Sequence, residues 1–506
     1  MSLQGSLFTS VLAKELQLFC IGGIYCSKRE FPMNKPIHHP GENNSNEVRD
    51  HLVKIEPRSL RTYTPSQAIL AKSAGSFHWT PEGRKLYDFT SGVLVANLGH
   101  NPVRWTKRFF ELMGWGNIDA AKESDGYFSA VTMTAYNAAT PIEIQASERL
   151  LALMRVHPVG ARMQQVLWAA SGSEGIQKAL WAAMAKDKNR DMIIATRYGF
   201  HGKKGLSNAI TGTENDKERD PRVKFISFPM CECNDLSMRD KPFDFTHYQK
   251  ELDALWHQYG RKLGVLITEP YLGGGGSYHP PKEYLQMLVR FCREKDIVFI
   301  LDEVQANFGR TGQNFAYESY GIEPDIVVLG KGLGNGVPVA AVVGRKDLFD
   351  CLDYGEASDT WSANPLCCAA VIATLEEFEN GKVIEHSRKV SAIIEEGLIA
   401  LKNDLPFVAN VRGEKGGMVW GVEMGDWGGK NSHEWACAMV EACYRGESNG
   451  DGIHILGPLA RKVIRISPPL TLSLAEAAAS MKLMHKLLAP LAKNNAGHEV
   501  VIAGGR

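Results

Sequence analysis

Short apolar runs alternate with stretches of helical periodicity through the middle of the chain. The runs read QQVLWAA, DMIIAT, GVLITEP, DIVFILDE and DIVVLGKG. Apolar runs of this kind, separated by helices, are typical of a parallel sheet that is covered on both faces. The pattern therefore predicts an α/β domain in the centre of the protein.

Two helices between these runs are predicted from apolar positions that fall on one face. In the helix expected over 174–186 these positions are Ile176, Ala179, Leu180 and Ala183. In the helix expected to start at Pro281, with the proline in its first turn, they are Tyr284, Met287, Leu288 and Phe291. After about residue 375 longer helices and a few strands (GGMVWGVEM, VIRISPP) predict a second, smaller domain.

The amino-terminal part of the chain has a different pattern. Residues 34–60 are rich in Asn, His, Pro and charge, which predicts a loose arm, and order is expected after it. From residue 84, RKLYDFTSGVLVANLGHNP predicts a short strand and a glycine-containing turn. The first 32 residues are moderately apolar, but Lys14 and Glu15 interrupt them, so we expect neither a membrane span nor a cleaved signal. We expect a disordered extension or a mis-assigned start, with Met33 as the alternative start.

Charge and cysteine content limit the classes of partner. Lys plus Arg (57) equals Asp plus Glu (57), and 44% of the 506 residues are hydrophobic. We therefore expect a globular protein that binds small molecules or other subunits, and neither nucleic acid nor a membrane. The ten cysteines are scattered and include no CxxC pair, so we expect reduced thiols in the cytoplasm and no metal site.

The stretch GGGGS at 273–277 has the composition of a flexible tether. It follows the expected strand GVLITEP and precedes the helix expected from Pro281, so both neighbours belong to one sheet domain. Ligand loops of α/β proteins lie just beyond strand ends. This position favours an active-site loop over a tether.

Two of the expected strands end in polar residues of opposite charge, Asp302 and Lys331. Parallel strands deliver both side chains to the same edge of the sheet, where partial burial destabilises an unpaired charge. The pair is either a buried ion pair or part of a site. Gly330 and Gly332 leave space around Lys331, which favours a lysine that forms an imine with a ligand.

A third strand runs into SGSEGIQKAL, which places Ser171, Gly172 and Ser173 at a helix amino terminus. Such a terminus binds phosphate through free N–H groups, although serines there often act only as N-caps. Together, a phosphate seat, a carboxylate and an uncrowded lysine fit pyridoxal phosphate.

These motifs resemble those of the class III, or ω-amino acid type, pyridoxal-phosphate aminotransferases over roughly residues 60–490. The resemblance rests on eight motifs in the family's order: FTSGVLVANLGHNP, AASGSEGIQKAL, FHGKKG, TEP-x2-GGGG, ILDEVQANFGRTG, PDIVVLGKGLGNGVPVAAVVG, DTWSANPLCCAA and IRISPPL. The family implies the fold of type I pyridoxal-phosphate transferases, with a mostly parallel seven-stranded sheet between helices and a smaller α+β domain.

The resemblance also implies roles for individual residues. Lys331 forms the imine with the cofactor, and Asp302 holds the ring nitrogen. The cofactor is further contacted by Gly172 and Ser173 at its phosphate, Phe200 and Val304 on the ring faces, Gln305 near the ring hydroxyl, His201, Glu269, and Thr360 from the neighbouring subunit. Arg465 matches the arginine that binds a substrate carboxylate, although the alternation of Val463, Arg465 and Ser467 also fits a solvated surface arginine.

Two positions depart from the family. Many relatives read EP-x2-GEGG, and their glutamate can cover the carboxylate-binding arginine during one half-reaction. In this chain Gly274 stands at the position of that glutamate. Val93 matches a pocket position that is often larger elsewhere, although it also fits as an ordinary core residue of a strand. Both departures put any transfer of ornithine or 4-aminobutyrate as substrates in doubt.

The sequence thus predicts a cytoplasmic aminotransferase that moves an amino group from an amine or ω-amino acid to a 2-oxo acid by a ping-pong route. An aminomutase or decarboxylase on the same fold remains the alternative, and an interaction protein without activity is disfavoured by Lys331 and Asp302. We expect a homodimer with shared active sites. The expected divisions are an extension over 1–50, a segment over 51–100 that packs with the small domain, a large cofactor-binding domain over 101–375 and a small domain over 376–506.

Overall fold

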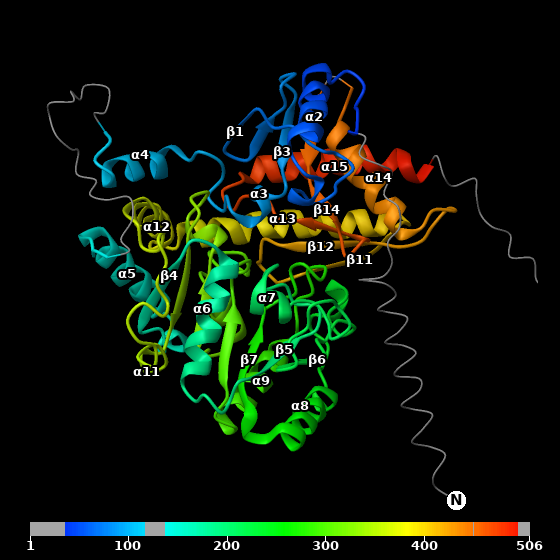
Figure 1. Ribbon diagram of the computed structural model, residues 1–506. Coiled ribbons are helices and arrows are strands. Elements are labelled where there is room, and N and C mark those ends of the chain that lie inside the picture. The colour runs from blue at the N-terminus through cyan, green and yellow to red at the C-terminus, as the bar shows by residue number, and fades with distance from the viewer. Residues whose placement is uncertain (1–35, 117–136, 449, 494–506) are drawn as a thin grey trace, which may run out of the picture.

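A computed structural model describes residues 36–116, 137–448 and 450–493. Figure 1 shows two parts: a large sheet with helices around it, and a smaller part that combines the two ends of the described chain. The expectations for the first 32 residues and for Met33 lie outside the described residues. None of the described helices is long and apolar enough to cross a membrane.

The large part is built on a seven-stranded sheet with strand order β4-β10-β9-β8-β7-β5-β6. Strand β10 is antiparallel to both of its neighbours, and the pairs from β9 to β6 are parallel. The strands are β4 (Gln165–Ala169), β5 (Met192–Thr196), β6 (Val223–Ile226), β7 (Leu263–Thr268), β8 (Val298–Asp302), β9 (Ile326–Leu329) and β10 (Ala340–Gly344). The mostly parallel seven-stranded sheet expected from the sequence is therefore confirmed.

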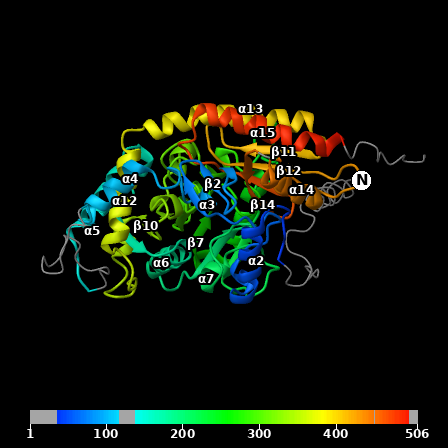
Figure 2. The same cartoon turned by 90° about the horizontal axis from the view of Figure 1, so that it is seen from above.

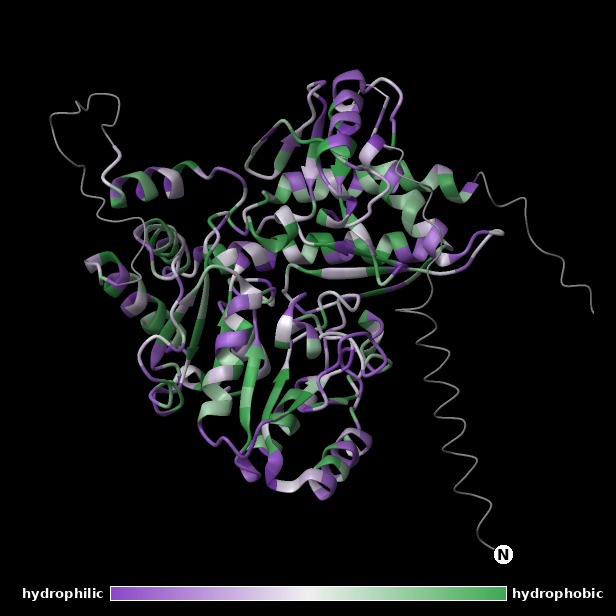
Figure 3. Ribbon diagram, in the orientation of Figure 1, coloured by the Kyte–Doolittle hydropathy of each residue, from purple (hydrophilic) through white to green (hydrophobic). Residues whose placement is uncertain are grey.

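Both faces of this sheet are buried, as the apolar runs require. Ile300 belongs to one hydrophobic cluster together with Ile176 of α6, whereas Phe299 and Leu301 belong to the cluster on the opposite face. Figure 3 shows the strands as a hydrophobic layer, while the outer helices carry hydrophilic stretches. The helices of this part are α4 (Val103–Leu112), α5 (Pro141–Met154), α6 (Gly172–Ala185), α7 (Gly205–Ala209), α8 (Thr246–Tyr259), α9 (Lys282–Glu294), α10 (Ala316–Tyr320), α11 (Lys346–Phe349) and α12 (Pro365–Phe378).

The two helices predicted from periodicity form as expected, with small shifts at their starts. All eight predicted apolar positions of α6 and α9 are buried. Helix α9 begins at Lys282, so Pro281 caps the helix and lies just outside its first turn. Its fixed φ of −55° and its missing N–H cost nothing at a position where no intrahelical donor is needed.

The smaller part contains two four-stranded sheets, with orders β11-β12-β15-β14 and β1-β2-β3-β13. The strands are β1 (Lys72–Ala74), β2 (Phe77–Trp79), β3 (Lys85–Asp88), β11 (Val408–Gly413), β12 (Trp420–Met424), β13 (Gly452–His454), β14 (Leu456–Leu459) and β15 (Val463–Ile466). Its helices are α2 (Asn43–Ile55), α3 (Ser91–Leu94), α13 (Lys382–Asp404), α14 (Ser432–Arg445) and α15 (Leu474–Lys493). Figure 2 shows α13 and α15 side by side across this part. Strand β3 pairs with β13, which supports the proposal that residues 51–100 pack with the carboxyl-terminal domain.

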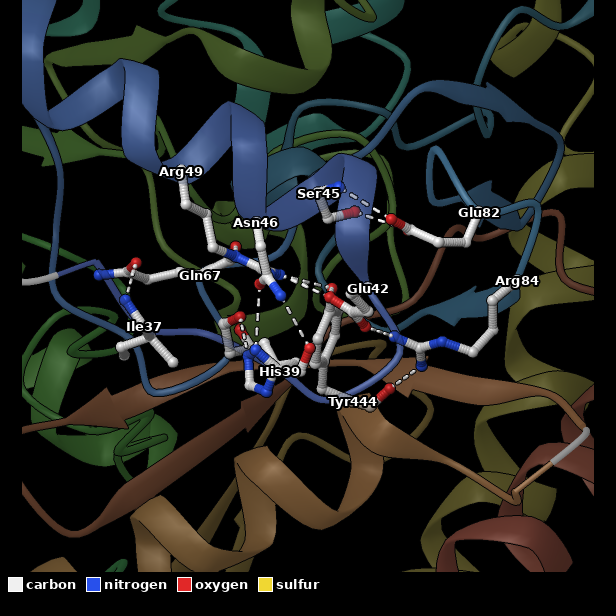
Figure 4. A network of polar contacts seen from close by, with 11 residues as sticks. Ile37, His39, Glu42, Ser45, Asn46, Arg49, Gln67, Glu82, Arg84 and Tyr444 are labelled. Carbon is white, nitrogen blue, oxygen red and sulfur yellow. Dashed lines mark hydrogen bonds and ion pairs between the residues drawn. The ribbon is translucent and has the colours of Figure 1, made fainter.

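The loose arm expected over 34–60, and the disorder expected up to residue 50, are wrong for the described residues, because 43–55 form α2. Figure 4 shows the polar network that holds this helix. The buried carboxylate of Glu42 accepts hydrogen bonds from Arg49 (2.8 Å) and from the Tyr444 hydroxyl (2.9 Å), and it also contacts Arg84. Buried charges are stable only when paired in this way. Tyr444 is distant in the sequence, so local composition could not indicate this order.

Candidate active site

A pocket of about 480 Å³ opens where β8 and β9 end. Its lining residues are Gly172, Ser173, Phe200, His201, Gly202, Lys203, Lys204, Glu269, Asp302, Val304, Gln305 and Lys331. Nine of them were singled out from the sequence. Parallel strands place their carboxyl ends at one edge of the sheet, which is where α/β proteins bind ligands.

Asp302 is the last residue of β8 and is buried. Its Oδ2 lies 2.7 Å from His201 Nδ1, and its Oδ1 accepts a hydrogen bond from the backbone N–H of Val304 at 3.0 Å. These two contacts hold the carboxylate in one orientation. His201 Nε2 is buried and has no hydrogen-bond partner in the described part of the chain.

Lys331 follows β9 and begins a short 3-10 turn, η7 (Lys331–Leu333), with φ of 47°. Its amine is not held in an ion pair: Asp302 pairs with His201, and no carboxylate of the described residues lies within ion-pair distance of Lys331. Burial is the main cause that lowers the pKa of Lys331 to about 8, and the nearby positive charge of Arg465 adds to it. The buried ion pair left open from the sequence is therefore excluded, and a reactive amine is what the geometry offers.

Helix α6 points its amino terminus at the same pocket. The Ser171 side chain is the N-cap and accepts the N–H of Glu174, whereas Gly172 and Ser173 line the pocket. A Cβ on Gly172 would lie 2.9 Å from Val304 Cγ1, and one on Gly202 would lie 2.2 Å from Ser173 Oγ. These glycines allow the close packing around a terminus whose free N–H groups and positive dipole end suit a phosphate.

Glu269 connects the glycine-rich loop to the pocket. Its Oε2 accepts the N–H of Phe200 at 2.9 Å, and its Oε1 accepts the N–H of Gly273 at 3.2 Å. Burial raises the pKa of Glu269 to about 7. Loop residues 271–280 are almost entirely buried, and the bridge between Leu272 and Tyr278 closes them into a turn between β7 and α9. The stretch is thus part of the large domain, and the tether is excluded.

Arg465 lies on β15 and is only 3% exposed, so the interpretation as a surface arginine is wrong. It donates a hydrogen bond from Nη1 to the side-chain oxygen of Gln305 at 2.8 Å, while its buried Nε has no partner in the described chain. Burial lowers the pKa of Arg465. A buried guanidinium that is held only by an amide retains hydrogen-bonding capacity for a carboxylate ligand.

Besides Arg465, three predicted residues are not among those that line this pocket. Thr360 is exposed, next to Trp361, which is 59% exposed. Val93 lies in the turn of α3, where its backbone is left-handed (φ 66°) and the residue is 44% exposed, so its interpretation as a core strand residue is wrong. Gly274 packs behind Phe200, and a Cβ on Gly274 would lie 3.2 Å from Phe200 Cβ.

Sequence reasoning missed Gly202, Lys203 and Lys204 as pocket residues. They belong to the FHGKKG motif, of which only Phe200 and His201 were given roles. Two adjacent lysines next to a predicted phosphate seat were a usable signal, because their positive charges favour an anionic ligand.

The comparisons with known proteins agree with this geometry. The family model for class-III aminotransferases matches residues 59–488, so the chain belongs to the class-III aminotransferase family and is an enzyme of that class. An acetylornithine aminotransferase from Oceanobacillus iheyensis is 28% identical over 449 residues, which cover 88% of this chain and 99% of that protein. A leucine/methionine racemase from Thermococcus litoralis is 27% identical over 475 residues, which cover 90% of this chain and 98% of that protein.

Solved structures show the same fold. An amine transaminase from an uncultivated Pseudomonas species, in its PLP-bound form, superimposes with a TM-score of 0.72 at 23% identity, covering 92% of this chain and 99% of that one. An aminotransferase from Bacillus anthracis gives a TM-score of 0.74 at 20% identity, covering 88% and 99%. The fold type I architecture expected from the sequence is thereby confirmed.

Proposed function

We propose that this protein binds pyridoxal 5'-phosphate and transfers an amino group from an amine or ω-amino acid to a 2-oxo acid in two half-reactions. One observation carries the proposal. The amine of Lys331, the carboxylate of Asp302 and the amino terminus of α6 all border a single pocket of about 480 Å³. A phosphate, a ring nitrogen and an aldehyde on one cofactor require those three groups.

The residues of the pocket fit this cofactor. Gly172 and Ser173 would hold its phosphate, with Lys203 and Lys204 nearby, and Asp302 would hold its ring nitrogen. Val304 and Phe200 would contact the ring faces, and Gln305, Glu269 and His201 would border its remaining edge. The buried, unpartnered Nε2 of His201 supports a polar ligand at this place. When bound, the cofactor supplies an electron sink that stabilises negative charge on the substrate carbon.

Lys331 has two tasks in this proposal. It anchors the cofactor, and once the substrate has displaced it, its neutral amine moves a proton at the substrate carbon. With a pKa of about 8, a substantial fraction of the amine is neutral slightly above neutral pH. Asp302 borders the pocket in one fixed orientation because His201 and the N–H of Val304 hold its two oxygens.

Arg465 is proposed to bind the carboxylate of the oxo acid. Its planar fork can replace the Gln305 contact with two charge-assisted bonds to a carboxylate. Gly274 provides no anion to cover this arginine, and the 3.2 Å distance from its would-be Cβ to Phe200 leaves little space for a larger side chain. We therefore propose that Arg465 is held only by the neutral amide of Gln305, which a carboxylate can displace, so that Arg465 stays available in both half-reactions.

We further propose a homodimer in which Thr360 reaches the phosphate of the neighbouring active site. The loop that carries Thr360 is fixed to α6 because Asp359 accepts a hydrogen bond from Lys178 at 2.5 Å. Tyr354 and Trp361 on the same loop are 103% and 59% exposed. Such exposed aromatic side chains support burial against a second copy. Sedimentation at assay concentrations tests this: an active monomer would refute it.

A single-turnover experiment tests the transfer itself. Holoenzyme is mixed with 4-aminobutyrate, N-acetylornithine or a monoamine without a carboxylate, and no acceptor is added. We expect the cofactor spectrum to convert to the amino form, and 2-oxoglutarate or pyruvate to reverse the change with formation of the matching amino acid. Lys262→Ala, which changes an exposed lysine outside the pocket, is the control for nonspecific loss of cofactor. No conversion with any donor, while the cofactor stays bound, would contradict amino transfer.

The relative that is named a racemase makes racemisation a second candidate, because it aligns over 98% of its own length. Incubation with an L-amino acid and no acceptor distinguishes the two. Appearance of the D-amino acid without loss of the cofactor's aldehyde form would favour racemisation. Release of carbon dioxide or of a positional isomer would instead favour a decarboxylase or an aminomutase.

A further inference from the structure

A cluster of histidine and aspartate side chains lies in the smaller part of the molecule, outside the pocket described above. His78 comes from β2, Asp88 ends β3, and His100 follows the turn of α3. One nitrogen or oxygen atom from each side chain can be chosen so that all three atoms lie within 4.8 Å of one another. His78 and Asp88 are buried, and the His100 side chain is 16% exposed, which gives the cluster a route to solvent.

His78 offers an unused lone pair to this cluster. Its Nδ1 lies 2.7 Å from Ser73 Oγ, whereas its Nε2 is buried, makes no hydrogen bond with any described residue and lies 3.5 Å from Asp88 Oδ1. With the proton on Nδ1, donated to the serine, Nε2 is a free acceptor that faces the carboxylate. Two acceptors facing each other inside a protein require a cation or a proton between them.

The other two members are oriented by their own neighbours. Asp88 Oδ1 accepts hydrogen bonds from the Thr90 N–H (2.7 Å), the Thr90 hydroxyl (2.8 Å) and the Ser91 N–H (3.1 Å). Its Oδ2 is left for His100 Nε2, which lies 2.7 Å away. The carboxylate thus presents Oδ2 to His100, while Oδ1, which the chain also holds, lies 3.5 Å from His78 Nε2.

We propose that this cluster is a zinc site in which His78 Nε2, His100 Nε2 and Asp88 Oδ2 bind the ion and a water molecule completes the coordination. Two imidazoles and a carboxylate are a common zinc ligand set, and the Ser73 contact is the outer partner that orients a ligating histidine. With bonds of about 2.0–2.1 Å to a tetrahedral ion, ligand atoms lie about 3.3 Å apart. The 2.7 Å contact of His100 with Asp88 then has to lengthen by only about half an ångström.

No metal site was expected from the sequence, because its cysteines form no CxxC pair. The proposed zinc site departs from that expectation. The three ligands come from different elements and their spacing matches no zinc motif. His454 on β13 flanks the cluster, with its ring centroid 5.6 Å from that of His78 and its buried Nδ1 unpartnered among the described residues. We count it as a neighbour and not as a ligand.

The test uses the holoenzyme after chelator treatment and titrates Zn²⁺ by calorimetry, with metal analysis after gel filtration. We expect one zinc ion per chain, with binding that raises the thermal midpoint. His78→Gln keeps a polar side chain of similar reach and should weaken binding at least tenfold. His485→Gln is the matched control, because His485 also pairs with an aspartate (Asp404, 2.9 Å) but on the surface. Loss of binding in the control and not in His78→Gln would overturn the assignment.

Ser73→Ala provides a second variant that leaves all three ligands in place. Removal of an outer partner of a metal-bound histidine should weaken zinc binding about ten- to a hundred-fold. Each variant is first checked for folding by its thermal midpoint in chelator, so that a misfolded variant is recognised and replaced by the other. No binding by the parent protein, or equal affinity in the parent, His78→Gln and Ser73→Ala, would show that the cluster is only a hydrogen-bonded network.

Discussion

The His201–Asp302 pair of the pocket and the His100–Asp88 pair of the small sheet have the same separation, 2.7 Å, but different surroundings. One Asp302 oxygen accepts a single backbone N–H. The side chain also borders the open pocket, whose Lys331 has no ion pair among the described residues. Asp88 receives three further hydrogen bonds from Thr90 and Ser91.

The comparison shows that a His–Asp pair does not by itself decide the chemistry of a site. The polar groups around the pair that lack a partner decide which ligand suits it. In and beside the pocket, the groups that lack a partner among the described residues are the Lys331 amine, His201 Nε2 and Arg465 Nε, which suit an anionic organic ligand. In the small sheet it is a buried imidazole nitrogen, His78 Nε2, beside a carboxylate, which suits a cation.

Removal of the lysine should have the largest effect. Lys331→Ala deletes both the anchor and the proton carrier, so kcat should fall by about ten-thousand-fold, while the fold is retained because a buried unpaired amine is removed. Steady-state kinetics and a thermal midpoint measured on the same sample check this. A rate within tenfold of the parent would remove Lys331 from the mechanism and with it the contrast between the two pairs.

Replacement of each aspartate by asparagine should distinguish the catalytic pair from the structural pair. Asp302→Asn should lower kcat about a hundred- to a thousand-fold, equivalent to about 2.7–4 kcal/mol, on the scale of one preorganised electrostatic group. Asp88→Asn should instead lower the free energy of unfolding by about 1.5–3 kcal/mol, because its charge-assisted hydrogen bonds to Thr90 and Ser91 weaken. Urea unfolding of both variants, with kinetics for Asp302→Asn, measures the two effects. If Asp302→Asn lost only stability, the pocket aspartate would be structural as well.

The arginine beside the pocket should have an intermediate effect. Arg465→Ala should reduce kcat/KM for the oxo acid about ten- to a hundred-fold, equivalent to about 1.5–3 kcal/mol for a bond to a charged group. A donor amine without a carboxylate should lose much less in its own half-reaction. Half-reaction kinetics with both substrate types provide the measurement, and Arg465→Lys, which keeps the charge but not the fork, should fall between the two. Equal losses for both substrate types would contradict the assignment.

The smallest predicted effect is on pH dependence. Burial lowers the pKa of Lys331 to about 8, and for a cationic group a lower pKa means that more of it is neutral at a given pH. The rate at which cofactor-free protein takes up pyridoxal phosphate should therefore rise about tenfold per pH unit below 8 and level off above it. Stopped-flow absorbance over a pH series checks this. A rise that continues to pH 10 would indicate an amine with the ordinary lysine pKa.

Much of the pocket could be predicted from local sequence. Asp302 and Lys331 each end an apolar run, and Gly172 and Ser173 start an amphipathic helix, so strand direction alone brings them to one edge of the sheet. The arm of residues 34–60 could not be predicted in this way, because its order depends on the contacts of Glu42 with Arg84 and Tyr444. The interpretation of Val93 as a core residue of a strand was also wrong, because its left-handed backbone depends on the turn that follows β3.

The sequence by itself determined the alternation of buried strands and helices, the residues at the strand ends and the family to which the chain belongs. These features depend on residues close together in the chain, where periodicity and motif order can be read directly. Only the tertiary structure decided that Asp302 pairs with His201, that Gln305 covers an arginine 160 residues away, and that His78, Asp88 and His100 converge. The physical reason is that a buried polar atom must find a partner wherever the packed chain places one, and no local pattern records which partner that is.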